Sequence, residues 1–138
     1  MQEETLPAGR RQFTPMAGSQ GPSCRILVED DAAFGEFMCQ AIAQETPHQA
    51  VRVSDSVEAL KVVTEITPDL LILDYHLPNM NGIEVYDHLH ATKELKHTPT
   101  IMMTAGVLEH DFGNRPIVGV SKPVPLNKLL DLIAELLE

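Results

Sequence analysis

Apolar residues in this chain follow two alternating patterns. Short continuous apolar runs, typical of buried strands, lie at residues 25–28, 50–53, 69–74, 99–104 and 117–121. Between them, apolar residues recur at helical spacing at residues 31–44, 57–66, from 82 onward, and 125–138. This alternation predicts an α/β protein with a parallel sheet, helices on both faces and right-handed crossovers.

The same spacing predicts which side of each helix packs on the sheet. We expect Phe34, Phe37, Met38, Ala41 and Ile42 to form the inner stripe of the first helix, Val57, Leu60, Val63 and Ile66 that of the second, Ile83, Tyr86 and Leu89 that of the third, and Leu126, Leu129, Leu130, Ile133 and Leu137 that of the last. Residues 54–56 provide an N-cap for the second helix, and Thr67 and Pro68 end it.

The first 23 residues differ from the rest of the chain. They contain three prolines and three glycines and show no apolar periodicity. We interpret residues 1–23 as a disordered tail or a vector-derived segment. Residues 24–138 then form a single domain, which is long enough to bury a core.

Charge and composition exclude several classes of protein. The formal net charge of −10 argues against direct binding of nucleic acid or of an anionic membrane. The sequence has neither a stretch of about 20 apolar residues nor the apolar core of a signal peptide. We therefore expect a cytoplasmic protein in which Cys24 and Cys39, its two cysteines, stay reduced.

Polar side chains follow the predicted strands at their carboxyl ends. Glu29 and Asp30 follow the first strand, Asp74 ends the third, Thr104 ends the fourth, and Lys122 follows the fifth. In open α/β folds ligands bind at this edge. Three carboxylates placed together require a cation, and oxygen ligands suit Mg²⁺. A carboxylate, Mg²⁺, a lysine and a hydroxyl are the groups needed to transfer a phosphoryl group onto a carboxylate.

Four motifs, taken in order, resemble the receiver domain of two-component response regulators. They are ILVEDD at residues 26–31, LDYHLPNMNG at 73–82, MTA at 103–105 and SKP at 121–123. The resemblance covers roughly residues 24–138. It implies a five-stranded, doubly wound, flavodoxin-like sheet in the order 2-1-3-4-5.

The resemblance also implies a role for each matching residue. Asp74 would accept a phosphoryl group from a sensor histidine kinase or phosphotransfer protein, while Thr104 and Lys122 would contact that group. Mg²⁺ would be held by Asp74, Asp30, Glu29 through water, and the backbone carbonyl of His76. Pro78 and Gly82 would shape the loop after Asp74, with Gly82 free to adopt a positive φ. In this family the bond between Lys122 and Pro123 is often cis.

The sequence departs from the family between Thr104 and Lys122. Gly119 stands where the family carries an aromatic residue that turns inward when the threonine moves. Residues 105–115 are a few residues shorter than usual and contain Gly106 and Gly113, so we expect a short or irregular helix there. One hypothesis is that phosphorylation is read by rearrangement of residues 105–114.

Other interpretations remain open at this point. Asp30 and Asp31 could simply cap the first helix, Thr104 and Lys122 could be ordinary surface residues, and the histidines could bind zinc. A receiver-like interaction module that needs no phosphorylation is the main alternative function. A phosphatase of the haloacid dehalogenase type would need an acid two residues after the nucleophile, and that position is His76.

The resemblance further implies a signalling domain rather than an enzyme acting on external substrates. The sequence given ends at Glu138, so we expect either a single-domain regulator that acts on a downstream protein target or a receiver separated from its output domain. The resemblance also allows a homodimer.

Overall fold

The computed structural model describes residues 24–29, 32–76, 80–105 and 112–137. Five parallel strands form one sheet in the order β2-β1-β3-β4-β5. Their bounds are Arg25–Glu29 for β1, Gln49–Val53 for β2, Leu70–Asp74 for β3, Thr100–Thr104 for β4 and Ile117–Ser121 for β5. The predicted sheet, its strand order and its doubly wound α/β class are confirmed.

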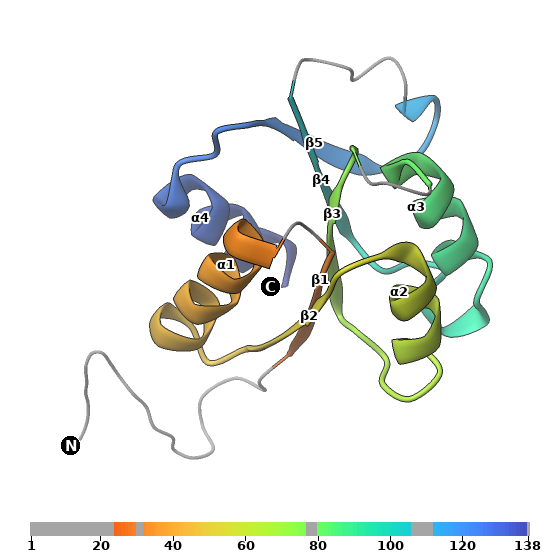
Figure 1. Ribbon diagram of the computed structural model, residues 1–138, viewed down its shortest axis with the longest axis horizontal. Helices are drawn as coiled ribbons and strands as arrows, with labels where there is room; N and C mark the ends of the chain where they lie inside the picture. The colour runs from red at the N-terminus through yellow and green to blue at the C-terminus, as the bar shows by residue number, and fades with distance from the viewer. Residues whose placement is uncertain (1–23, 30–31, 77–79, 106–111, 138) are drawn as a thin grey trace.

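Helices cover both faces of this sheet (Figure 1). Helices α1 and α4 pack on one face, and α2 and α3 pack on the other. Their bounds are Ala32–Glu45 for α1, Ser56–Val62 for α2, Gly82–His90 for α3 and Leu126–Leu136 for α4, and a 3₁₀ turn, η2, spans Lys93–Leu95. No helix in the described ranges is both long enough and apolar enough to cross a membrane.

Successive residues of the inner strands enter two separate cores. Leu71 and Leu73 pack with α2 and α3, whereas Leu70 and Ile72 pack with α1 and α4. Every residue of β3 and of β4 is buried. This explains the continuous apolar runs, because a strand covered on both faces has no side for polar residues.

Two predicted core residues lie on the surface instead. Phe37 is 52% exposed and Val57 is 69% exposed. The buried stripe of α1 is centred on Met38 and Ile42, and Phe37 is rotated by about 100° from Met38 around the helix axis. In α2 the buried residues are the small Ser56 and Ala59, so Val57 points outward.

Helix α2 is also shorter than predicted, ending at Val62 rather than Ile66. The N-cap is Asp55, whose side chain accepts a hydrogen bond from the backbone N–H of Glu58. At the other end, the Thr64 hydroxyl donates to the backbone carbonyl of Lys61 at 2.7 Å. Such a bond competes with the helical ladder, and the helix stops there.

The third and last helices largely match their predicted faces. Tyr86 and Leu89 are buried in α3, while Ile83 is only partly buried and Val85, which was not predicted, is fully buried. In α4, Leu129 and Ile133 are buried, and the other predicted leucines are partly buried. Most of the expected irregular helix at 105–115 lies outside the described residues.

Gly82 is needed for space rather than for an unusual backbone angle. It begins α3, and the positive-φ glycine among the described residues is Gly113, so the expectation of a positive φ at Gly82 was wrong. A Cβ on Gly82 would contact the Met102 sulfur and would lie 2.9 Å from Tyr75 Cα and 3.0 Å from the Asp74 carbonyl oxygen. The first turn of α3 therefore rests directly on the end of β3.

Gly82→Ala should lower the free energy of unfolding by about 1–3 kcal/mol, a typical cost of overpacking. The Met102 side chain can move away from the added methyl group, but the backbone of Tyr75 and Asp74 can move only with β3. Urea unfolding of the two proteins measures the difference. An unchanged midpoint and slope would show that α3 can shift without cost.

His48 is hydrogen-bonded to the residue that precedes β1. Its Nδ1 accepts a hydrogen bond from the backbone N–H of Cys24 at 3.1 Å, so this nitrogen is unprotonated. Burial lowers the pKa of His48 below its ordinary value of 6.5, and the nearby Asp69 carboxylate offsets part of this effect. The neutral ring thus ties the start of β1 to the segment between α1 and β2.

The folded protein should become less stable as the pH falls below 6.5, in part through His48. Because the folded pKa is the lower one, the unfolded chain binds the proton first, and stability is lost as the pH falls from 6.5 toward the folded pKa. His48→Asn keeps an acceptor for the Cys24 N–H but does not titrate. The free energy of unfolding of both proteins is measured between pH 5 and pH 8, a range of about 3 units around the histidine pKa. It should fall more steeply with decreasing pH in the wild type than in His48→Asn. Parallel curves would contradict this.

Candidate functional site

Asp74 is a buried carboxylate with two defined contacts. It is the last residue of β3 and is 5% exposed. One oxygen, Oδ2, accepts a hydrogen bond from Lys122 Nζ at 2.9 Å, and the other, Oδ1, accepts one from the backbone N–H of His76 at 3.0 Å. A buried carboxylate requires such partners because leaving water is costly for a charge. A carboxylate has about four lone-pair positions, so both oxygens can still accept further bonds.

The sheet brings Lys122 to Asp74 across one intervening strand. Strand β4 lies between β3 and β5, and Thr104 at its end is in register with Ser121. The next residue, Lys122, donates its backbone N–H to the Thr104 carbonyl oxygen at 2.7 Å. This bond fixes where the lysine side chain starts, from which its ammonium reaches Asp74. The bond from Lys122 to Pro123 is cis.

Thr104 ends the strand beside Asp74. It is 3% exposed, and its neighbour Met103 is in register with Asp74. Thr104, which carries the hydroxyl, therefore lies one position beyond the Asp74 carboxylate on the adjacent strand. Asp74, Thr104 and Lys122, which the sequence predicted for three different strand ends, come together at one edge of the sheet.

The predicted metal ligands are described only in part. Glu29 ends β1, and its backbone is in register with Leu73, next to Asp74. Nothing of the Glu29 side chain is described, and Asp30 and Pro78 lie outside the described residues. His76 follows Asp74 directly through the loop, with an exposed side chain. Asp74 and the end of β1 thus lie at the same edge of the sheet, and carboxylate oxygens are ligands of the type that Mg²⁺ prefers.

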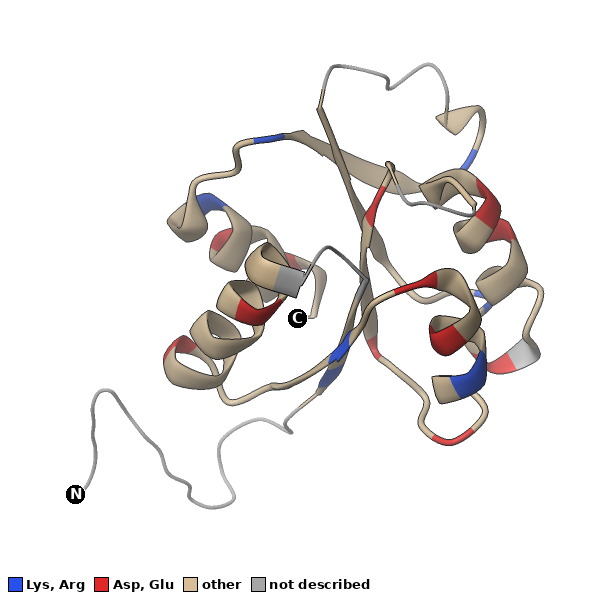
Figure 2. Ribbon diagram, in the orientation of Figure 1, with Lys and Arg blue, Asp and Glu red and all other residues tan. Residues whose placement is uncertain are grey.

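Acidic residues lie on helices of both faces of the sheet (Figure 2). The chain has 20 acidic residues against 10 lysines and arginines. An anion bound at the sheet edge would therefore need a nearby positive charge. Lys122 supplies such a charge, since its ammonium already contacts the Asp74 carboxylate.

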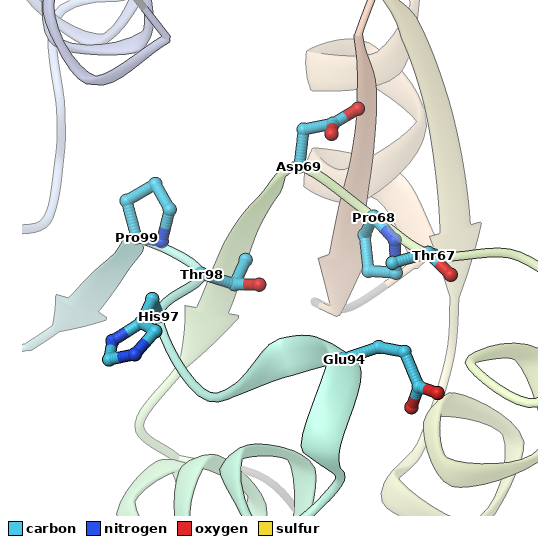
Figure 3. A pocket seen from close by; sticks show the side chains of 7 residues that line it. All are labelled: Thr67, Pro68, Asp69, Glu94, His97, Thr98 and Pro99. Atoms are coloured by element: carbon cyan, nitrogen blue, oxygen red, sulfur yellow. The ribbon is translucent and has the colours of Figure 1, made fainter.

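A cavity of about 320 Å³ opens at the amino-terminal ends of the strands, opposite the end of the sheet that carries Asp74. Its lining residues are Thr67, Pro68, Asp69, Glu94, His97, Thr98 and Pro99 (Figure 3). These residues precede β3 and β4, whereas Asp74 and Thr104 end them. Asp69 is already engaged there, because its Oδ2 accepts the backbone N–H of Arg25 at 2.8 Å. Ligands of open parallel sheets bind at the carboxyl ends of the strands. This cavity is therefore separate from the site at Asp74.

Sequence reasoning missed one set of contacts around α3. Arg115, just before β5, forms an ion pair with Asp87 of α3 at 2.7 Å. The two residues are 28 positions apart, and neither lies in a recognisable motif. Only the fold could have revealed this pair.

The comparisons with known proteins agree on one family. The family model of the response regulator receiver domain matches residues 26–134. The sensory/regulatory protein RpfC of Xanthomonas campestris is 28% identical over 120 residues, which are 83% of this chain but only 16% of RpfC. The polar-differentiation response regulator DivK of Brucella ovis is 26% identical over 112 residues, covering 78% of this chain and 91% of DivK.

A solved structure shows the same fold. It is the receiver domain of the sensor histidine kinase PA1611 from Pseudomonas aeruginosa, with a magnesium ion coordinated in its active-site cleft. The TM-score is 0.72 at 18% sequence identity, with 84% of this chain and 98% of that chain covered.

Lys122→Met should lower the free energy of unfolding by about 1–3 kcal/mol, because it removes the ammonium partner of a buried carboxylate. The change keeps the apolar stem of the side chain. In the double variant Lys122→Met with Asp74→Asn, the uncompensated charge is gone, and part of the lost stability should return. Urea unfolding of the four proteins completes the cycle; strictly additive effects would mean that the contact contributes nothing.

Proposed function

The chain belongs to the response regulator receiver domain family, and on this basis we propose that Asp74 is its phosphoryl acceptor. The observation that carries the proposal is the buried Asp74 carboxylate, held by Lys122 at 2.9 Å beside Thr104 at the carboxyl edge of the sheet. In this proposal the receiver occupies residues 24–138. It changes its affinity for a partner protein when it is phosphorylated.

The transfer itself needs a nucleophile and compensation of charge. An Asp74 oxygen attacks the phosphorus of a phosphohistidine, a P–O bond forms, and the P–N bond breaks with its electron pair leaving on the histidine ring. Lys122 moves from the carboxylate to a phosphoryl oxygen, and the Thr104 hydroxyl donates to another. The new group carries roughly 1.5 to 2 negative charges, which explains why a cation must stand next to it.

The residues at this edge fit a bound magnesium ion. We propose that Asp74, Asp30, Glu29 through water, and the His76 carbonyl would hold it. When bound, Mg²⁺ supplies positive charge to the phosphoryl oxygens. The support is the chemistry of the proposed donors, carboxylate oxygens and a backbone carbonyl from positions at or just after the ends of β1 and β3, together with the magnesium ion in the related PA1611 receiver domain.

The partners proposed for this chain follow from the family. A sensor histidine kinase or phosphotransfer protein would donate the phosphoryl group, and a downstream protein or an output domain would read it, in the cytoplasm. The negative net charge favours a protein target over direct contact with nucleic acid or membrane. RpfC, of which this chain spans 16%, and DivK, of which it spans 91%, are examples of a long and a short relative.

Incubation with acetyl phosphate and Mg²⁺ should give one base-labile, acid-stable phosphoryl adduct, detected by mass spectrometry of the intact protein. Asp74→Asn should abolish the adduct because an amide is not a nucleophile of this kind. Removing Mg²⁺ with a chelator should also prevent it, since the transferring oxygens then lack their cation.

Asp69→Asn is the matched control. Asp69 precedes the same strand at the opposite edge of the sheet, and asparagine still accepts the Arg25 N–H. This variant should be phosphorylated like the wild type. A wild-type chain that stays unlabelled, or a label that survives Asp74→Asn, would contradict the proposal; an unlabelled chain would favour the phosphorylation-independent module instead.

A further inference from the structure

Arg115 joins two parts of the fold that are distant in sequence. Its Nε and Nη2 donate to Asp87 Oδ1 and Oδ2 at 2.8 and 2.7 Å, and its Nη1 donates to the Phe112 carbonyl oxygen at 2.9 Å. We call these three bonds the Arg115 clamp. A bidentate arginine–carboxylate pair restricts geometry more than a single contact does.

The clamp closes a compact turn just before β5. Phe112 is buried in the core that α2 and α3 cover, and the backbone N–H of Arg115 donates to its carbonyl oxygen at 3.2 Å. Gly113, between them, has a φ of 64°, which residues with a Cβ rarely adopt. Arg115 thus holds the turn through the Phe112 carbonyl, and its pairing with Asp87 joins the turn to α3.

Strand β5 connects this clamp to the site at Asp74. Ile117, its first residue, donates its N–H to the Arg115 carbonyl oxygen at 2.8 Å. Lys122 follows its last residue and contacts Asp74. Within the described part of the chain, β5 is an edge strand that pairs with β4 alone, so a single ladder resists its displacement. A shift of Lys122 along the strand direction would pull on Arg115.

Helix α3, the other side of the clamp, also contacts the site. Its first turn rests on the end of β3, where Gly82 donates its N–H to the Tyr75 carbonyl oxygen at 2.9 Å. Its last turn is held by His90, whose ring nitrogens lie 3.0 Å from the Tyr86 carbonyl oxygen and 2.9 Å from that of Thr98. Asp87 thus sits on a helix anchored at both ends.

We propose that the Arg115 clamp stabilises the arrangement in which Lys122 contacts Asp74, and that this clamp opposes phosphorylation of Asp74. The inference rests on the proposed function. Placing a phosphoryl group on Asp74 requires Lys122 to leave its position 2.9 Å from Oδ2. Lys122 follows the last residue of β5 directly, so any shift of its backbone that accompanies this movement displaces the carboxyl end of β5, and the clamp at the other end resists.

Two properties of the pair fit this role. The hydrogen bond from Arg115 lowers the pKa of Asp87 and Asp87 raises that of Arg115, so the pair stays ionised at neutral pH. Its side chains are 32% and 51% exposed, and exposed pairs contribute little. The clamp can therefore bias an equilibrium without locking it.

The test measures the affinity for beryllofluoride, a phosphoryl mimic, in the presence of Mg²⁺ by calorimetry. Arg115→Met and Asp87→Ala should each raise the affinity about two- to fivefold, the range expected from losing an exposed pair. The double variant should match the single ones, because all three lack the same interaction. Arg115→Lys, which keeps the charge but not the bidentate geometry, should fall between.

This pair of variants separates the clamp from simple electrostatics. Removing Arg115 takes away a positive charge and should weaken binding of an anion, whereas removing Asp87 should strengthen it. Only loss of the clamp moves both affinities upward. Arg52→Met removes an exposed positive charge from β2, which three strands separate from β5. This variant is the matched control and should not raise the affinity.

Hydrogen exchange gives a second readout. In the wild type, the Arg115 and Ile117 amides should lose protection when beryllofluoride binds. The clamp is overturned if the affinities of Arg115→Met and Asp87→Ala for beryllofluoride are unchanged or change in opposite directions. It is also overturned if protection at these amides is unchanged. Either result leaves the proposed function intact. A wild-type chain that fails to bind beryllofluoride overturns both.

Discussion

A carboxylate at the end of a strand that is buried on both faces is the constraint on which this structure depends. Asp74 ends β3, where every residue is buried. An ionised group in that position needs charged or hydrogen-bonding partners, and the fold supplies Lys122 and the His76 N–H. The parallel sheet makes this possible because the carboxyl ends of its strands share one edge.

The same geometry links packing to the site. The first turn of α3 approaches the end of β3 so closely that Gly82 has no room for a side chain. Lys122 is fixed by a backbone bond to the end of β4. Asp74 therefore lies at the end of a strand that packs closely against α3, and its lysine partner is bonded to the end of β4. The Arg115 clamp joins α3 to the segment just before β5, away from the site.

How much of this could be predicted differed from element to element. The strands and their polar ends were predictable, because runs such as residues 69–74 have a clear pattern and Asp74, Thr104 and Lys122 follow directly in the chain. The helix faces were less so. Phe37 and Val57 have the right spacing for a core stripe, yet both are exposed. Met38 in α1 is buried as predicted, and in α2 the small Ser56 and Ala59, which were not predicted, are buried. The spacing of apolar residues locates the buried face of a helix only to within one neighbouring position. How the helix packs on the sheet decides which of the neighbouring residues is buried.

The sequence by itself therefore determined the α/β class, the five strands and the residues that stand at their carboxyl ends, because these features depend on local patterns of period and polarity. Only the tertiary structure decided that Lys122 reaches Asp74 across β4, that Gly82 is required for close packing, and that Arg115 pairs with Asp87. Each of these contacts joins residues brought together by the sheet and its crossovers. Contacts between side chains far apart in the chain leave no local signal, so they appear only when the chain is folded.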